Sequence, residues 1–69
     1  MQTSARNQLR GTVQTVTIGA VMAEVVVDVS GQQIVAAITK DSAERLGLEA
    51  GASVTVIVKA TDVMIGIDD

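Results

Sequence analysis

The sequence predicts an all-β fold, a small five-stranded Greek-key barrel with one short helix between the third and fourth strands. Apolar residues alternate with polar ones over most of the 69 residues, which is the period of half-buried strands. One stretch, residues 40–51, breaks this period and carries helical spacing instead. The resulting order, three strands, a helix and two strands, fits a barrel of the oligonucleotide/oligosaccharide-binding (OB) type.

The first three strands are predicted to follow one another closely. Residues 8–18 form the first, and a shift in their apolar phase indicates a β-bulge or a strong bend. Alternating valines place the second strand over residues 21–29. Ser30-Gly31 predicts a hairpin turn, after which residues 32–39 return as a third strand. That strand is apolar on both faces, which favours a closed barrel or contact with another subunit.

The helix is predicted within residues 40–51 and lasts one to two turns. Asp41 with Glu44 three residues later fits a capping box, with Asp41 as the N-cap. Ala43 and Leu46 then face inward at helical spacing. The glycine that follows fits the left-handed position that ends a helix.

Two further strands complete the predicted barrel. Residues 53–60 resume the alternation, with valines facing inward and polar residues outward. Residues 63–67 form the predicted fifth strand, in which Val63, Ile65 and Ile67 share one face. All 69 residues are expected to form a single domain.

The composition predicts an obligate oligomer. A chain of this size buries only about 60% of its unfolded surface, so small domains usually rely on disulfides, a metal or oligomerisation. This chain has no cysteine, no histidine and no aromatic residue, yet 48% of its residues are apolar. Disulfides and the usual zinc ligands are therefore excluded, and burial against other subunits is the remaining solution.

Composition also narrows the functional classes. The net charge is −3 and aromatic stacking residues are missing, which argues against nucleic-acid binding. Without histidine or cysteine there is no ordinary general base near neutral pH, so no enzyme activity is expected. The acidic residues lack the spacing of a metal loop, and no cofactor is expected. No apolar run is long enough to span a membrane and no signal peptide is visible, so a cytoplasmic protein without membrane contact is expected.

Binding of a small anion fits the remaining residues. An oxyanion needs hydrogen-bond donors, which backbone N–H groups, hydroxyls, Lys and Arg supply. Such donors gather near both ends of the chain, and one threonine closes the third strand. The candidates are Ser4, Ala5, Arg6, Asn7, Thr39, Lys59, Ala60 and Thr61. On spacing alone, solvated surface cations are the simpler explanation of Arg6 and Lys59.

Three segments resemble the molbindin (Mop) family of small cytoplasmic molybdate- and tungstate-binding proteins. They are Thr3-Ser4-Ala5-Arg6-Asn7-Gln8-Leu9-Arg10-Gly11, Ala37 to Gly51, and Lys59-Ala60-Thr61-Asp62-Val63-Met64-Ile65. The resemblance extends over essentially the whole chain as one stand-alone copy. The Ser-Ala-Arg-Asn-Gln motif is its most specific part.

This resemblance implies a hexamer, a trimer of dimers, with oxyanion sites between subunits. Residues 4–6 of one subunit would then meet residues 59–61 of another, and Thr39 stands where the family places a hydroxyl ligand. A second site is implied near the threefold axes, around Gly19-Ala20-Val21, where the turn amides are expected to be free. Met22 stands where relatives often carry a hydroxyl residue. The role implied is intracellular molybdenum storage or homeostasis.

A second family gives an alternative from another functional class. Residues 38–59 also resemble swapped-hairpin, AbrB-like transition-state regulators, which bind DNA as dimers. Those proteins carry a basic strand face near the N-terminus. Here the corresponding region holds Glu24 and Asp28 and few cations.

Overall fold

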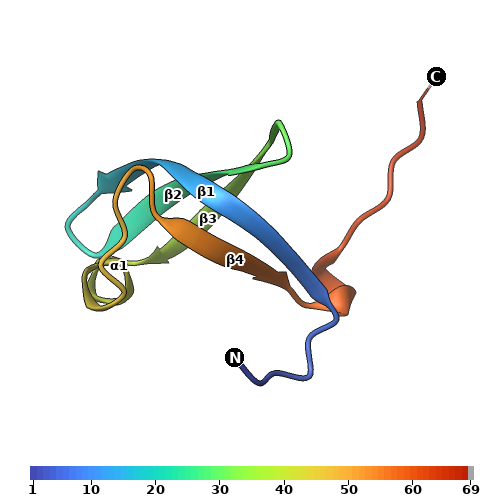
Figure 1. The fold of residues 1–69 in the computed structure, drawn as a ribbon, viewed down its shortest axis with the longest axis horizontal. Coiled ribbons are helices and arrows are strands. Elements are labelled where there is room, and N and C mark those ends of the chain that lie inside the picture. The colour runs from blue at the N-terminus through green and yellow to red at the C-terminus, as the bar shows by residue number, and fades with distance from the viewer. Residues whose placement is uncertain (69) are drawn as a thin grey trace.

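The structure, a computed structural model, describes residues 1–68 and consists of one antiparallel sheet with a short helix at one end (Figure 1). Within these residues there are four strands, one α-helix and one 3-10 turn. The elements are β1 (Asn7–Ile18), β2 (Met22–Val29), β3 (Gln32–Thr39), α1 (Lys40–Arg45), β4 (Ser53–Val58) and η1 (Ala60–Asp62). The all-β fold and the position of its helix are therefore as predicted.

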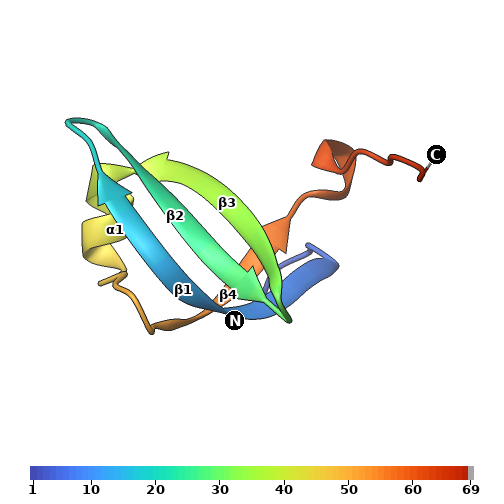
Figure 2. The ribbon, with the colours of Figure 1, turned by 90° about the horizontal axis from the view of Figure 1, so that it is seen from above.

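The sheet has the order β3-β2-β1-β4, so the long strand β1 is central. Its first half, from Asn7 to Thr12, pairs with β4, and its second half pairs with β2. The register of β1 against β2 shifts between Val13 and Thr15, which confirms the predicted irregularity in this strand. The shift strengthens the coiling of the sheet, which is visible from above in Figure 2.

The hairpin between β2 and β3 turns where the sequence predicted. Val29 pairs directly with Gln32, which leaves Ser30 and Gly31 as a two-residue loop. Both loop residues have positive φ, 50° and 86°. Two positive φ values define the type of turn whose twist matches that of the flanking strands, and glycine adopts them without strain. The turn therefore fixes the register of the β2–β3 ladder.

The helix lies within the predicted residues 40–51, but its N-cap stands two residues before the predicted one. Thr39 is its N-cap, because the Thr39 side chain accepts a hydrogen bond from the Ser42 backbone N–H at 3.0 Å. The prediction of Asp41 as N-cap was wrong, since Thr39 at the end of β3 already has the extended backbone that a cap requires. Ala43 is buried as predicted, whereas Leu46, predicted to face inward, lies beyond the last helical residue and is 65% exposed. Within residues 1–68, no helix is long and apolar enough to cross a membrane.

The core is small and aliphatic. Val13, Val25 and Val27 form its buried centre, and half-buried residues of β3, β4 and the loop after α1 pack around them. The concave side of the sheet remains open between its two edge strands, β3 and β4. The closed barrel of the prediction is therefore not formed by residues 1–68 of one chain.

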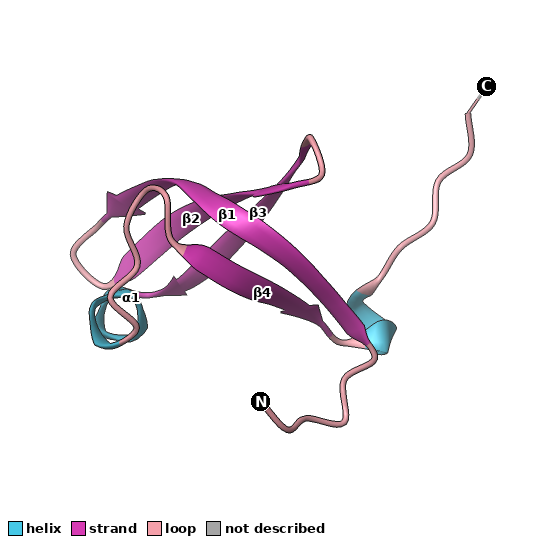
Figure 3. Cartoon of the chain, viewed as in Figure 1, coloured by secondary structure: helices cyan, strands magenta, loops and turns pink. Residues whose placement is uncertain are grey.

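The predicted fifth strand is absent from the described structure. After η1, residues 63–67 form a loop that runs away from the sheet and pairs with no strand (Figure 3). Met64, Ile65 and Ile67 are 92%, 87% and 89% exposed. Apolar residues do alternate in this segment. A strand also needs a neighbouring strand to pair with, and residues 63–67 do not lie along either edge of their own sheet.

Candidate functional site

The β1–β4 ladder joins two of the segments that the sequence singled out. Asn7, the first residue of β1, pairs with Val58, the last residue of β4. Arg6 and Lys59 follow directly beyond this pair on the two strands. Figure 1 shows the start of β1 and η1 at the same end of the sheet, with the N-terminal segment running on away from η1. The structure therefore places the segments that carry residues 4–7 and 59–61 at one end of the sheet, joined through the Asn7–Val58 pair.

The chain turns sharply after β4, and the residues of this turn are exposed to solvent. The Asp62 N–H donates to the Lys59 carbonyl at 2.8 Å, and the Val63 N–H donates to the Ala60 carbonyl at 3.3 Å. These bonds close the short helix η1 over Ala60–Asp62. Lys59, Ala60 and Thr61 are all exposed, so their donors face solvent at the end of the sheet.

Two side chains hold the N-terminal segment that precedes β1. The Gln8 side-chain Nε2 donates to the Ala5 carbonyl at 2.6 Å. The Ala5 N–H donates to Thr3 Oγ1 at 3.2 Å. Sequence reasoning assigned no role to Thr3 or Gln8, although both stand within the motif that carried the resemblance. An oxyanion that takes the Ala5 N–H would replace Thr3 Oγ1 as its acceptor.

Positive charge concentrates at this end of the molecule. Lys40 and Arg45 on α1 pair with Glu44 and Asp41, at 3.9 and 3.6 Å. The other cations, Arg6, Arg10 and Lys59, form no ion pair with the carboxylates of residues 1–68. The unpaired cations thus lie on or beside the first part of β1 and the end of β4, where an anion would gain most from them.

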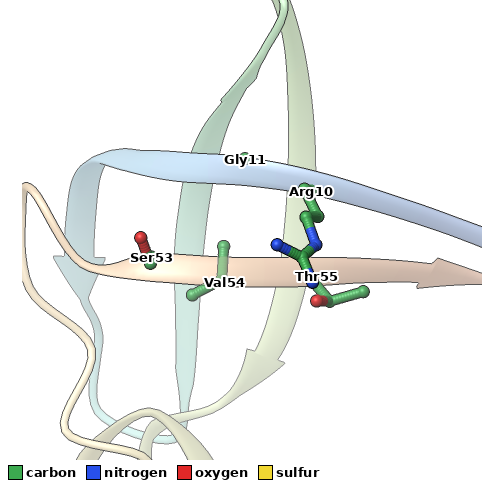
Figure 4. Close-up of a pocket in the computed structure, with 5 residues that line it drawn as sticks. All are labelled: Arg10, Gly11, Ser53, Val54 and Thr55. Carbon is green, nitrogen blue, oxygen red and sulfur yellow. The ribbon is translucent and has the colours of Figure 1, made fainter.

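Arg10 is a cation that sequence reasoning left out of the site. Its side chain extends from β1 across β4 to Thr55, beside a shallow hollow of about 210 Å³ (Figure 4). Arg10 pairs with Thr55 in the β1–β4 ladder, three pairs inward from Asn7. It therefore adds positive charge along the same strand without belonging to the segment at its end.

Thr39 lies apart from these residues, at the end of the sheet that carries α1. It pairs with Met22 across the β2–β3 ladder, and its hydroxyl caps α1. The next residue, Lys40, donates its N–H to the Val21 carbonyl at 2.7 Å. Thr39 is therefore grouped with the second candidate site, and a single chain does not bring it to residues 4–7.

The second candidate segment, Gly19-Ala20-Val21, forms the turn between β1 and β2. Its amides were expected to be free, but the Gly19 N–H donates to the Met22 carbonyl at 2.8 Å. Of the three residues of this turn, Ala20 and Val21 have amides that form no hydrogen bond with residues 1–68. Within the same residues, no group of three acidic or metal-ligating side chains could hold a metal ion.

Comparison with known proteins identifies close relatives over nearly the full length. A family model described as the TOBE domain matches residues 3–65. Molybdenum-pterin-binding protein 2 of Clostridium pasteurianum is 50% identical over 66 residues, which cover 94% of this chain and 97% of that protein.

Two solved structures share the fold. A molybdate-binding protein from Sporomusa ovata superposes with a TM-score of 0.92 at 45% identity, covering 97% of this chain and 100% of the other. ModG, described as a cytoplasmic molybdate-binding protein and solved with molybdate bound, superposes with a TM-score of 0.83 at 44% identity. That match covers 87% of this chain and 43% of ModG.

Proposed function

This chain belongs to the TOBE domain family, among its molbindin (Mop) members, and on that premise we propose that it binds molybdate or tungstate as a single Mop domain. The proposal rests on one observation above the others. The Asn7–Val58 pair sets Arg6 and Lys59 at the same end of the sheet, and neither pairs with a carboxylate of residues 1–68. Two free cations beside exposed amides and hydroxyls form a donor-rich surface for an anion.

The chemistry of the ligand matches these donors. Molybdate is a dianion without protons at neutral pH, so it only accepts hydrogen bonds. The donor groups available are those of Ser4, Ala5, Arg6, Asn7, Lys59, Ala60 and Thr61. Hydrogen phosphate differs from molybdate in carrying a hydroxyl, which would need an acceptor among groups that mainly donate.

We further propose that the site is completed between subunits of a hexamer, a trimer of dimers. Ser4, Arg6 and residues 59–61 are exposed in one chain and Ala5 and Asn7 are half-buried, whereas a tight anion site needs its charges removed from water. A second copy covering this end of the sheet would supply that burial. Across chains, residues 4–6 of one subunit would then face residues 59–61 of another.

The exposed tail, residues 63–67, supports association of this kind. An apolar groove of about 250 Å³ lies on the concave side of the sheet, and both β3 and β4 contribute to it. The outer edges of β3 and β4 have no strand partner among residues 1–68. A tail from a second copy could pair with such an edge and bury Val63, Ile65 and Ile67 there. The fifth strand would then come from another subunit.

The remaining candidates fit a site shared between chains. Thr39 and the turn Gly19-Ala20-Val21 lie together at the far end of the sheet, so only another copy could bring them to residues 4–7 or to a symmetry axis. We assign Thr39 as a hydroxyl donor in such a contact, where its proton would turn to the ligand from the Ser42 hydroxyl, to which it donates at 2.8 Å in one chain. The Ala20 and Val21 amides are the donors of the second, threefold-axis site.

The biological role proposed is molybdenum storage or homeostasis in the cytoplasm, by binding rather than catalysis. ModG, a relative, is itself described as cytoplasmic. We expect no nucleic-acid or membrane partner. For the DNA-binding alternative, the strand that would need a basic face carries Glu24 and Asp28, so no observation favours it.

Titration calorimetry of the purified protein tests the proposal directly. Molybdate and tungstate should bind with saturable heats, sulfate should bind less tightly, and phosphate should bind least. Only the folded oligomer should bind molybdate. If molybdate gives no more heat than phosphate at the same concentration, the chain is not an oxyanion-binding protein of this kind.

A further inference from the structure

We infer that Gln8 is a positioning residue that orients the Ala5–Arg6 peptide so that the candidate site presents an N–H donor and hides a carbonyl. The inference rests on the proposed oxyanion function and deepens it. Its starting observation is the 2.6 Å hydrogen bond from Gln8 Nε2 to the Ala5 carbonyl. This bond turns the Gln8 side chain back along the chain by three residues, away from the ladder in which Gln8 itself is paired with Ile57.

The Ala5–Arg6 peptide is the first one that the sheet does not hold. The ladder with β4 begins at Asn7, and Arg6 belongs to no strand. A peptide outside a ladder in an exposed segment can rotate as a unit between two orientations. In one of them its N–H faces a ligand, and in the other its carbonyl does. The Gln8 side chain supplies the contact that selects between them.

Because the peptide is planar, the bond from Gln8 to the Ala5 carbonyl also fixes the direction of the Arg6 N–H. The Ala5 carbonyl and the Arg6 N–H belong to the same peptide, which is trans, so they point in opposite directions. With the carbonyl held toward Gln8, the Arg6 N–H must point away from it. That N–H forms no hydrogen bond with any atom of residues 1–68, so it is available to an oxyanion.

The chemistry of Gln8 suits this function. A side-chain amide carries two N–H donors without charge, so it can satisfy a carbonyl and leave the positive field of Arg6 and Lys59 unchanged. A carboxylate at position 8 could not donate when ionised and would repel both the carbonyl and the anion. An apolar side chain of equal length would fill the same space and release the peptide.

The orientation of this peptide also bears on ligand choice. A carbonyl facing the ligand would repel molybdate, which has no proton to donate. It would accept a hydrogen bond from the hydroxyl of hydrogen phosphate. By hiding the Ala5 carbonyl, Gln8 removes one acceptor from the surface that faces the ligand. Gln8 is therefore expected to set discrimination against phosphate as well as affinity for molybdate.

The test compares molybdate binding and phosphate competition in the wild type, Gln8→Met and Gln8→Glu. Loss of one hydrogen bond in Gln8→Met should weaken molybdate binding about three- to tenfold. Gln8→Glu should weaken it more, because it also adds a negative charge. In both variants the ratio of phosphate affinity to molybdate affinity should be higher than in the wild type, so that phosphate competes better for the site. In the proton–nitrogen correlation NMR spectrum of the wild type, the Arg6 backbone amide should show the largest chemical-shift change when molybdate is added. That change should be smaller in Gln8→Met.

Gln32→Met and Gln32→Glu are the matched controls. Gln32 is an exposed glutamine at the start of β3, and its side chain forms no hydrogen bond within residues 1–68. Both control variants should bind like the wild type. If Gln8→Met binds molybdate with the affinity of the wild type and discriminates against phosphate equally well, the inference is overturned and the proposed function stands. An absence of molybdate binding by the wild type would overturn both.

Discussion

Gly11 on β1 lies so close to Asp28 on β2 that a β-carbon at position 11 would stand 2.6 Å from the Asp28 backbone oxygen. It would also lie 2.7 Å from a methyl group of Val27. Gly11 sits where β1 changes neighbours, just before Thr12, which pairs with both β4 and β2. The absence of a side chain here lets one strand serve both halves of the sheet and carry residues 4–7 to the end of β4.

Gly11→Ala should therefore lower the free energy of unfolding by about 1–3 kcal/mol, because the added methyl group meets backbone that cannot yield easily. Denaturant unfolding at fixed protomer concentration measures this. Gln32→Ala is the control, because Gln32 is exposed at the start of β3 and its side chain forms no hydrogen bond within residues 1–68. Equal stability of Gly11→Ala and Gln32→Ala would show that β1 and β2 can move apart at Gly11 without cost.

Much of the fold could be predicted because it depends on local signals. Alternation located the four observed strands, Ser30-Gly31 supplied the backbone angles of a tight turn, and a phase shift marked the bulge in β1. The helix cap was misplaced because two polar residues near one another, Thr39 and Asp41, could each serve. Only the path of the chain leaving β3 decides which of them has extended geometry.

The fifth strand could not be placed because alternation shows that a segment is suited to a strand but not which edge it joins. Residues 63–67 have the pattern and lack a partner in their own chain. The candidate site has the same character. Residues 4–6 and 59–61 were expected to meet between subunits, and within one chain the Asn7–Val58 pair places both segments at the same end of the sheet. The roles of Thr3 and Gln8 depend on turns in an irregular segment, for which the sequence has no periodic signal.

Arg6→Ala and Lys59→Ala should each weaken molybdate binding strongly. A charged hydrogen bond to a bound anion contributes roughly 2–5 kcal/mol, so each variant should lose about 30-fold in affinity or more. Calorimetry on the folded variants measures the loss. Arg45→Ala is the control, because Arg45 lies on α1 at the other end of the sheet and pairs with Asp41. A loss in Arg45→Ala equal to the other two would point to net charge rather than a local site.

A mixture of Arg6→Ala and Lys59→Ala chains should recover binding that neither variant has alone. If each site joins residues 4–6 of one subunit to residues 59–61 of another, some contacts in mixed oligomers pair two intact segments. The two variants would be unfolded, refolded together and assayed for bound molybdate, with mixed assembly verified by a mass tag on one of them. Mixed oligomers without recovered binding would place both segments of each site in the same chain.

Ile65→Asp should dissociate the oligomer or block its assembly. Ile65 is 87% exposed in one chain and is expected to be buried against another subunit, where a carboxylate would be desolvated without a partner. Light scattering at micromolar concentration should give a hexamer mass for the wild type and a smaller mass for Ile65→Asp. Ile65→Val, which keeps an apolar branched side chain, should remain assembled.

Because the oxyanion site is proposed to be completed by a second copy, Ile65→Asp should also lose molybdate binding, although residue 65 supplies no donor to the anion. A hexamer that survives Ile65→Asp would show that the tail is not part of the subunit contact, and a wild-type protein that is a folded monomer would remove the basis for a shared site.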